Sequence, residues 1–385
     1  LLVLWGKRER MNTLTVSCEK RILQAAVWCA GRVVAAKSTI SALEGILVEA
    51  STEGLRLSGY NLETGIITRV DAQVTQPGSL ILSARLFGEI IRKLPDDMIT
   101  VSTEGNSVHI ACGPTSFDIM GSPADEFPEL PAVDDGSSVT LTQSALRSML
   151  SQVLFAVSTN ESRPVHTGAL FEVEDTTLTL VAVDGYRLAL RRETFIRKFG
   201  MNTFSFVVPG NALTEVERIC ADCDDEVIVT LGDRHVTFQV GQTLLVSRRL
   251  EGEFLNYRQT IPQNNPISLY VDTSMLQLSI DRASLIINDK LKSPLRCKFE
   301  DGSLAISSRT AIGSAFDRCP IAGDGQGLEI GFNNRYLMEA VKAAPAQEVR
   351  MELGTPTSPC LLLPKDGEPD NFLYMILPVR LKAGE

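Results

Sequence analysis

The chain has 385 residues, 44% of them apolar and 22% charged, which suits a globular protein of two or three domains. Its 47 acidic residues outnumber its 37 basic ones. That balance excludes a molecule coated throughout in the positive charge that nucleic acids attract, but it allows a local basic surface. No apolar run reaches the length of about 18 residues that a membrane-spanning helix needs. We therefore expect a cytoplasmic protein without a membrane partner.

The first ten residues look like an addition to the natural chain. The apolar stretch Leu1–Trp5 precedes the charged residues 7–10, which is the reverse of the order in a secretory signal. We expect Met11 to be the natural start and residues 1–10 to be an upstream extension.

Cysteines and histidines give no sign of a metal site. Of eight scattered cysteines, only Cys220 and Cys223 have the spacing of a metal-binding pair. A structural zinc site needs four ligands, and the three histidines are isolated. We expect reduced thiols and no metal.

Patterns typical of enzymes are missing as well. The sequence contains neither a G-x-x-x-x-G-K-[ST] phosphate loop nor a G-x-S-x-G nucleophile motif. Three isolated histidines offer little general-base chemistry. We expect no catalytic residues, no enzymatic activity and no cofactor.

The predicted elements, in chain order, begin with a strand after Met11 and a helix near residues 19–34. Strands follow over 43–50 and 54–58. A second helix over 83–94 has Ser83 as its N-cap and apolar residues at helical spacing. Short strands follow over 99–102, 107–111 and 116–120. The first series of elements ends at residues 126–128.

The same order of elements then returns twice. The second series predicts helices over 142–157 and 209–220, with strands over 170–173, 178–183, 227–231, 235–240 and 243–248. The third predicts helices over 273–287 and 333–343, with strands over 304–308, 347–352, 360–363 and 372–378.

The regular spacing of these elements predicts three repeated domains. The second helix of each series begins at residue 83, 209 or 333, so the interval is about 125 residues. Each repeat would hold two helices and two antiparallel sheets, an α+β plan. Boundaries in the polar stretches 133–138 and 262–266 give domains 11–135, 136–262 and 263–385.

One predicted hairpin stands out, over residues 178–190 (LTLVAVDGYRLAL). The β-strand-like run Leu178–Val183 has the period-2 pattern of a pleated strand and ends at Asp184-Gly185, a pair that favours tight hairpin turns. Shape alone favours an ordinary hairpin that has a charged edge.

Repeated domains joined end to end form arcs, and head-to-tail contacts close arcs into rings. Inward-facing helices would then line a tube. The predicted helices carry many basic residues, which could face that tube or be ordinary solvated charges: Lys20, Arg21, Arg32, Arg85, Arg92, Lys93, Arg147, Arg218, Arg282, Arg335 and Lys342.

Four short motifs add a specific resemblance. They are Val181–Ala189 (VAVDGYRLA), Arg163-Pro164-Val165 leading to Gly168, the run from Phe254 to Pro262, and the ending Leu377–Leu381 (LPVRL). With their order and the triple repeat, residues 11–381 resemble the bacterial β sliding clamps, the beta subunits of DNA polymerase III.

The resemblance implies a head-to-tail homodimer, a ring of six similar domains around duplex DNA. Such a ring tethers the replicative polymerase for processive synthesis and has no enzymatic activity. The alternative is a paralogous clamp with altered partner selection for repair or specialised replication.

Sequence-independent DNA contact requires basic residues that reach phosphate. Lys37 matches a DNA-contacting basic residue of the family, and Arg163 lies in a loop near the lumen. Arg85, Arg147 and Arg218 on predicted helices are further candidates. Ser38 replaces the family's usual Pro, and Pro164 and Val165 stand where some members have aromatic residues.

The resemblance also implies a pocket for short peptides of the polymerase alpha subunit, the clamp loader, repair polymerases and mismatch-repair proteins. Three positions depart from the family: His166 replaces a common Leu, Val183 a Thr and Leu255 a Pro. The matching positions are His166, Val183, Gly185, Tyr186, Arg187, Leu188, Leu255, Thr260, Met375, Leu377, Val379 and Arg380.

The contact between subunits is implied in the same way. Leu285 and Ile286, late in the predicted helix 273–287, match the family's apolar interface pair. Phe117 and Ile119 match its partner surface. The alternative places Leu285 and Ile286 in a core, but adjacent helical positions cannot both face one core.

Overall fold

The structure is a computed structural model that describes residues 13–133, 136–287, 293–367, 369 and 371–381. The predicted extension 1–10 and Met11 lie outside the described residues. The chain divides into two compact units. Unit 1 contains the described residues up to Ser144 together with Ile196–Met201 and Arg218–Arg249. Unit 2 contains Ala145–Phe195, Asn202–Glu217 and the described residues from Leu250 onward.

Unit 1 is built on two antiparallel sheets and two helices, α1 (Lys20–Gly31) and α2 (Ala84–Lys93). The five-stranded sheet runs in the order β5 (Gln73–Gln76), β1 (Thr15–Glu19), β7 (Met98–Glu104), β8 (Ser107–Cys112) and β9 (Thr115–Met120). The ten-stranded sheet runs in the order β10 (Ser122–Pro123), β6 (Gly78–Ser83), β2 (Gly45–Ser51), β3 (Gly54–Tyr60), β4 (Thr64–Val70), β19 (Thr243–Arg248), β18 (His235–Val240), β17 (Glu226–Leu231), β11 (Ser137–Thr142) and β15 (Arg197–Phe199).

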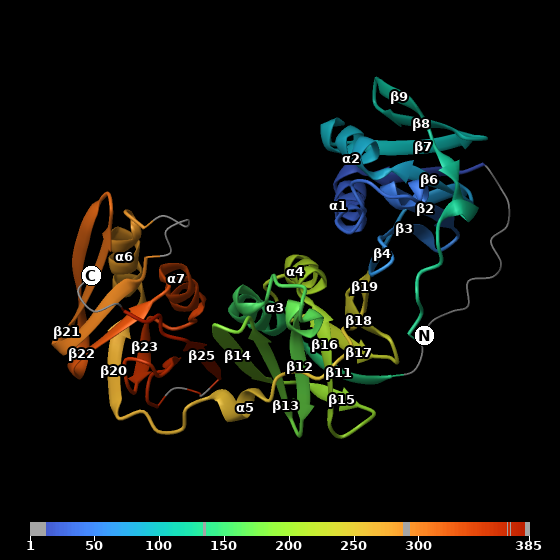
Figure 1. The fold of residues 1–385 in the computed structure, drawn as a ribbon. Helices are drawn as coiled ribbons and strands as arrows, with labels where there is room; N and C mark the ends of the chain where they lie inside the picture. Colours follow the sequence, from blue (N-terminus) through green and yellow to red (C-terminus); the bar gives the residue numbers. More distant parts are fainter. Residues whose placement is uncertain (1–12, 134–135, 288–292, 368, 370, 382–385) are drawn as a thin grey trace. The chain divides into compact units, whose positions relative to one another are not determined.

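Helices α1 and α2 lie side by side and contribute to the main core of unit 1 (Figure 1). Helix α1 buries Leu23, Ala26, Val27 and Ala30, the spacing of a single helix face. Burial of a leucine or valine side chain, such as Leu23 or Val27, contributes about 1.5–3 kcal/mol to the stability of the fold. The hydroxyl of Ser83 accepts a hydrogen bond from the Leu86 amide at 3.5 Å, which confirms the predicted N-cap of α2.

The ten-stranded sheet crosses a predicted domain boundary. Strand β4 pairs antiparallel with β19, and the pair Ile66 and Leu245 is buried within this join. The hydroxyls of Thr68 and Thr243 lie 3.0 Å apart beside it. The sequence patterns predicted separate sheets for each repeat and missed β4, so this pairing is a finding of the structure.

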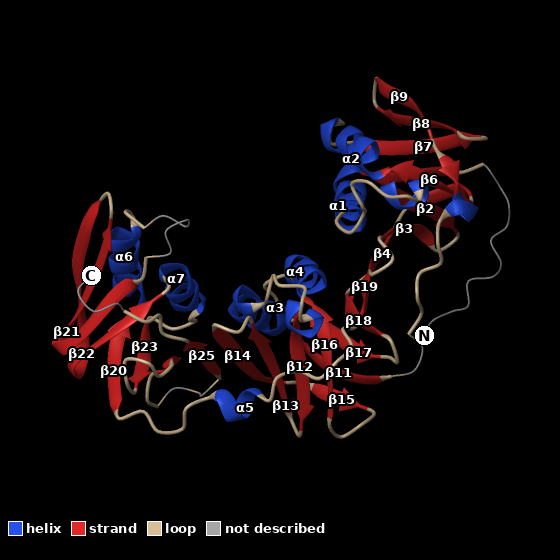
Figure 2. Ribbon diagram, in the orientation of Figure 1, coloured by secondary structure: helices blue, strands red, loops and turns tan. Residues whose placement is uncertain are grey.

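Unit 2 contains a second ten-stranded antiparallel sheet (Figure 2). Its order is β16 (Phe204–Pro209), β12 (Gly168–Glu174), β13 (Thr177–Val183), β14 (Arg187–Thr194), β25 (Phe372–Ile376), β24 (Cys360–Pro364), β23 (Glu348–Leu353), β20 (Ile267–Asp272), β22 (Gly313–Phe332) and β21 (Leu295–Thr310). The helices that lie wholly or mainly in this unit are α3 (Gln143–Val153), α4 (Gly210–Ile219), α5 (Tyr257–Thr260), α6 (Thr273–Ser284) and α7 (Asn334–Ala343).

Three predicted helices are shorter in the structure. Helix α1 ends at Gly31 instead of near residue 34. Helix α3 ends at Val153 and a 3₁₀ turn, Leu154–Ala156, follows. The carbonyl of Phe155 in this turn accepts a hydrogen bond from Arg187, so a tertiary contact replaces helical bonding. Helix α6 ends at Ser284, before the predicted end at residue 287. No helix in the described ranges is long and apolar enough to cross a membrane.

Candidate functional site

The predicted hairpin forms, and the side chain of Asp184 fixes its turn. One carboxylate oxygen of Asp184 accepts hydrogen bonds from the amides of Tyr186, at 2.9 Å, and Arg187, at 3.1 Å. Gly185 adopts φ = +89°, a left-handed conformation that glycine reaches without strain. These contacts are local, which is why the Asp-Gly pair predicted the turn correctly.

The end of the hairpin meets the C-terminal segment. Strand β14 pairs with β25, so that Leu188 lies opposite Met375, and the Leu377 amide donates to the Tyr186 carbonyl at 2.9 Å. The structure therefore brings together two stretches that are almost 190 residues apart in the chain. The resemblance implied this meeting, but it could not be derived from the periodicity of either stretch.

An apolar row crosses one face of the sheet at this meeting. Val183 lies opposite Leu188, Leu188 opposite Met375, and Met375 opposite Leu361. All four are buried. The same cluster contains further residues that were not predicted, although the alternation along their strands could have indicated them. These residues are Leu170, Val181, Leu190, Val207 and Leu363.

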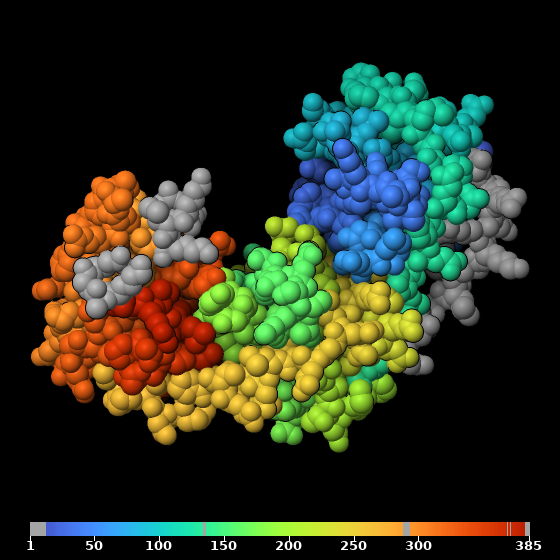
Figure 3. Space-filling model, in the orientation of Figure 1, coloured from blue at the N-terminus to red at the C-terminus, as the bar shows by residue number. Residues whose placement is uncertain are grey.

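The segment 250–261 lies against this apolar face, at the surface of unit 2 and drawn in gold (Figure 3). Phe254, Tyr257 and Ile261 pack on the cluster. The predicted site residue Leu255 is 39% exposed beside them. The predicted Thr260 hydroxyl donates to the Tyr257 carbonyl at 2.7 Å, so it closes the short helix α5.

Hydrogen bonds to strand β12 hold that segment in place. The Tyr257 hydroxyl donates to Glu172 Oε2 at 2.6 Å, and Arg258 donates to both Glu172 oxygens, at 2.6 and 3.1 Å. Arg258 also donates to Glu174 at 3.0 Å. Burial and the bond to Glu172 raise the pKa of the Tyr257 hydroxyl, which therefore stays a neutral donor.

His166 is half-buried, and its ring makes an edge-to-face contact with Phe254 at a centroid distance of 5.4 Å. Burial, with a smaller contribution from the nearby Arg163 charge, lowers the pKa of the imidazole. The ring is consequently neutral at pH 7 and can serve as part of an apolar surface.

Arg187 does not lie on the apolar face. It alternates with Leu188 along β14, and its side chain is only 6% exposed on the opposite side of the sheet. There it contacts Asp184, Glu339 on α7, the Phe155 carbonyl and the ring of Tyr336, 4.5 Å from the ring centroid. Arg187 therefore ties the turn to α7, and its place in the peptide pocket stays a prediction.

The remaining predicted pocket residues lie around the apolar row. Tyr186 is 60% exposed and stacks on Tyr336 at a centroid distance of 6.0 Å. The Val379 amide donates to the Gly331 carbonyl at 2.7 Å, which attaches the C-terminal segment to β22. Tyr186 therefore lies where the hairpin meets the C-terminal segment, and His166 reaches the apolar row through its contact with Phe254.

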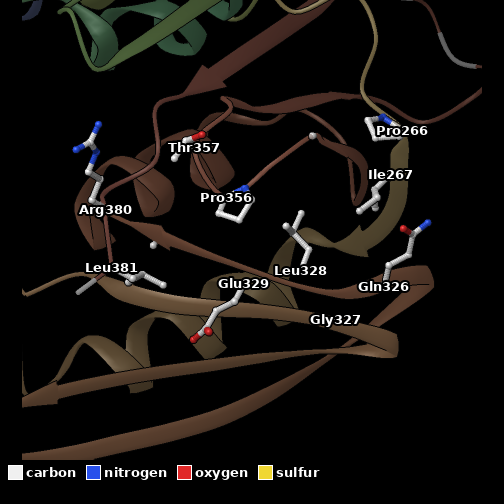
Figure 4. A pocket seen from close by; sticks show the side chains of 12 residues that line it. Pro266, Ile267, Gln326, Gly327, Leu328, Glu329, Pro356, Thr357, Arg380 and Leu381 are labelled. Carbon is white, nitrogen blue, oxygen red and sulfur yellow. The ribbon is translucent and has the colours of Figure 1, made fainter. Parts of the chain in front are cut away.

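A cavity of about 720 Å³ lies next to this region and shares only Arg380 with it. Leu328 and Pro356 lie close together in its centre, whereas Arg380 lies at its edge (Figure 4). Its lining residues are Pro266, Ile267, Gln326, Gly327, Leu328, Glu329, Gly331, Gly354, Pro356, Thr357, Arg380 and Leu381.

The basic residues predicted to contact DNA are all on the surface of their units. Lys37 lies in the loop after α1, and Arg163 begins a 3₁₀ turn, Pro164–Thr167. The other three lie on helices α2, α3 and α4 respectively: Arg85, Arg147 and Arg218.

The residues predicted at the subunit contact are placed at element ends and edges. Phe117 and Ile119 lie on β9, an edge strand, and Ile119 also packs against the core of unit 1. Leu285 caps α6 instead of lying within it and is 79% exposed. Ile286 follows it and is partly exposed.

No group of three or more His, Cys, Asp or Glu side chains that could hold a metal occurs among the described residues. Cys220 is buried, and Cys223 lies 3.6 Å from an Asp225 oxygen.

Comparison with known proteins identifies the family along almost the whole chain. Three domain models of the DNA polymerase III beta subunit match in order: the N-terminal domain over residues 14–131, the central domain over 140–256 and the C-terminal domain over 258–380. The chain therefore contains three clamp domains, and the ten-stranded sheets join neighbouring domains within each unit.

Individual relatives agree with the domain matches. The beta sliding clamp of Staphylococcus epidermidis is 31% identical over 91% of this chain and 94% of its own. That of Bacillus subtilis is also 31% identical, over 91% of this chain and 95% of its own. The crystal structure of the Bacillus subtilis DNA polymerase sliding clamp superposes with a TM-score of 0.89, covering 96% of this chain and all of that one, at 29% identity. The chain belongs to the DNA polymerase III beta subunit family, the bacterial beta sliding clamps.

Proposed function

We propose that this DNA sliding clamp receives peptide segments of its partners on the apolar row Val183–Leu188–Met375 and the side chains around it. The observation that carries the proposal is the meeting of the hairpin with the C-terminal segment. It creates a buried apolar floor whose end adjoins the exposed Tyr186. The exposed Leu255 lies in the segment that packs on this floor, and Arg380 is exposed shortly after Leu377. Peptide sites combine such a floor with a few polar groups that fix orientation.

The partners we propose are the replicative polymerase, the clamp loader, repair polymerases and mismatch-repair proteins. An extended peptide would place its apolar side chains over the floor and its polar ones near Arg380. His166 supports this arrangement because a neutral imidazole packed on Phe254 can replace an aliphatic side chain. Nothing in the described residues favours the alternative of a clamp with altered partner selection.

The ring itself is the second part of the proposal. Domains 11–135, 136–262 and 263–385 would close head to tail as a homodimer, with Phe117 and Ile119 of one subunit against Leu285 and Ile286 of the other. An edge strand and a nearly fully exposed leucine are otherwise unfavourable surface features. Phosphate contact would come from Lys37, Arg85, Arg147, Arg163 and Arg218, and no chemical step is involved.

Fluorescence polarisation with a labelled peptide of the Gln-x-x-Leu-Phe type tests the peptide site. A Leu255→Glu substitution places a charge beside the floor and should weaken binding about ten-fold or more, because the carboxylate loses hydration when the peptide docks. Leu278→Glu is the matched control, since Leu278 is an exposed leucine on α6. Equal affinity of both variants would contradict the site.

A further inference from the structure

The exposed face of helix α1 carries an aromatic side chain stacked on a cation. Arg21, Ala25, Trp28 and Arg32 follow one another at steps of four, three and four residues, opposite the buried face of the helix. Trp28 is 54% exposed, and the Arg32 guanidinium lies over its ring at 4.4 Å from the centroid. A single exposed apolar residue is ordinary, but a tryptophan that holds an arginine in a fixed position is a specific arrangement.

The surroundings of this pair are basic. Residues 20–37 and 84–93, which include α1 and α2, contain seven Lys or Arg and one acidic residue, Glu89. The chain as a whole has 37 basic and 47 acidic residues. Helices α1 and α2 lie side by side. Lys20 pairs with Asp96 at 3.0 Å, and the other basic residues leave a local excess of positive charge on this part of unit 1. Such a surface attracts a polyanion.

We propose that Trp28 and Arg32 act together as a contact for the phosphate backbone of duplex DNA. The inference rests on the sliding-clamp function. It adds Trp28, and it gives a specific role to Arg32, which the sequence analysis named only as one of many basic residues on predicted helices. A planar guanidinium can stack on an aromatic ring and still donate from its edge to phosphate oxygens. Because the ring restricts the guanidinium beforehand, less side-chain freedom is lost on contact.

Duplex DNA fits this pair better than unpaired bases. One face of the indole is already covered by Arg32, whereas a base-stacking site needs an open aromatic face. Backbone contact also carries no sequence information, which is what a clamp that moves along DNA requires.

The chain offers a direct readout, because its only tryptophans are Trp5 and Trp28. In a Trp5→Phe variant all tryptophan emission comes from Trp28. Titration with a duplex of about 30 base pairs at about 50 mM salt should change this emission and reduce its quenching by acrylamide, in step with binding followed by anisotropy of labelled DNA. Binding by anisotropy with unchanged Trp28 emission and quenching would overturn the proposal while leaving the clamp function intact.

The salt dependence separates a phosphate contact from a structural role. Arg32→Gln should reduce the slope of log K against log salt by about 0.9 for the lost phosphate contact. Trp28→Ala should weaken binding about three-fold by releasing the guanidinium. Arg69→Gln on strand β4 is the matched control, an exposed arginine outside the helical surface, and it should leave the slope unchanged.

Circular dichroism will verify that each variant is folded, and Trp28→Phe retains a ring if Trp28→Ala does not fold. Equal slopes for Arg32→Gln and the parent would contradict the contact. So would a complete lack of duplex binding by the parent at low salt, which would also remove the proposed role of the other basic residues.

Discussion

At the scale of single residues, Arg187 shows how a buried charge can hold a turn in place beside the proposed peptide site. Its guanidinium is shared among Asp184, Glu339 and the Phe155 carbonyl. Burial opposes ionisation of Glu339, but hydrogen bonds from Arg335 and Arg187 outweigh it, so the pKa of this carboxyl lies below its ordinary value. The turn that carries Tyr186 is thereby fastened to α7.

Replacement of Arg187 by Met should therefore be strongly destabilising. We expect a loss of about 3 kcal/mol, because Glu339 and Asp184 would keep partly buried charges without their partner. Arg335→Met removes the other cation that contacts the Glu339 carboxylate. Because Arg335 is 73% exposed, this substitution should lower the free energy of unfolding by at most about 0.5 kcal/mol. Denaturant unfolding of both variants measures the difference, and similar losses would show that the buried pair has no special role.

On the proposed peptide site, His166 should make peptide binding depend on pH. Its pKa is already lowered by burial in the free protein, and a docked peptide would bury it further and favour the neutral form. Binding should thus be strongest above the ordinary histidine pKa and should weaken as the pH falls through the lowered value. We expect a progressive loss of affinity as the pH falls below the ordinary histidine value, measured by polarisation titrations from pH 8 downward.

Two histidine variants control this expectation. His166→Leu should remove the pH dependence, whereas His235→Leu should retain it, since His235 lies on β18 in unit 1. An affinity of the parent protein that stays flat between pH 8 and 5 would show that His166 does not contact the peptide.

At the scale of elements, two glycines illustrate how backbone conformation decides the sign of a substitution. Gly185 has φ = +89° and open space where a Cβ would be added, so Gly185→Ala should cost about 1 kcal/mol through backbone strain alone. Gly88 lies inside α2, where an added Cβ would meet Val27 at an ordinary 3.8 Å. Gly88→Ala should stabilise by about 0.5–1 kcal/mol. Thermal unfolding tests both, and shifts of the same sign would refute the argument.

Strand pairing is the element-scale feature that shapes the site. The joins β4–β19 and β14–β25 each connect strands of different clamp domains within one unit. Because the second join places Met375 beside Leu188, the apolar floor exists only when both domains are folded. Long-range pairing of this kind cannot be inferred from the local pattern of either strand.

At the scale of the whole molecule, the head-to-tail homodimer predicts a mass of twice 42.0 kDa. Replacing both Leu285 and Ile286 by Ala should give monomers, because the contact would lose its apolar anchors. Met275→Ala with Leu278→Ala is the matched control, since both side chains are exposed on α6. Light scattering after size-exclusion chromatography measures the mass, and a Leu285/Ile286 variant that stays dimeric would rule out the assignment.

The sequence by itself determined the local elements and the family. Period-2 and helical spacing located the hairpin at Asp184-Gly185 and the helix capped by Ser83, because turn and cap chemistry act over a few residues. Its repeat of about 125 residues indicated three domains. Three floor residues, Val183, Leu188 and Met375, were named through the resemblance.

Only the tertiary structure decided which strands pair and which way side chains point. Five glycines interrupt the pattern of β22, so its pairing with β21 had no clear periodic signal. The position of Arg187 on the opposite face follows from the register of β14 against β25, and a shift of one residue would reverse it. Register is set by contacts between distant segments, and for this reason the floor of the site became visible only in the folded chain.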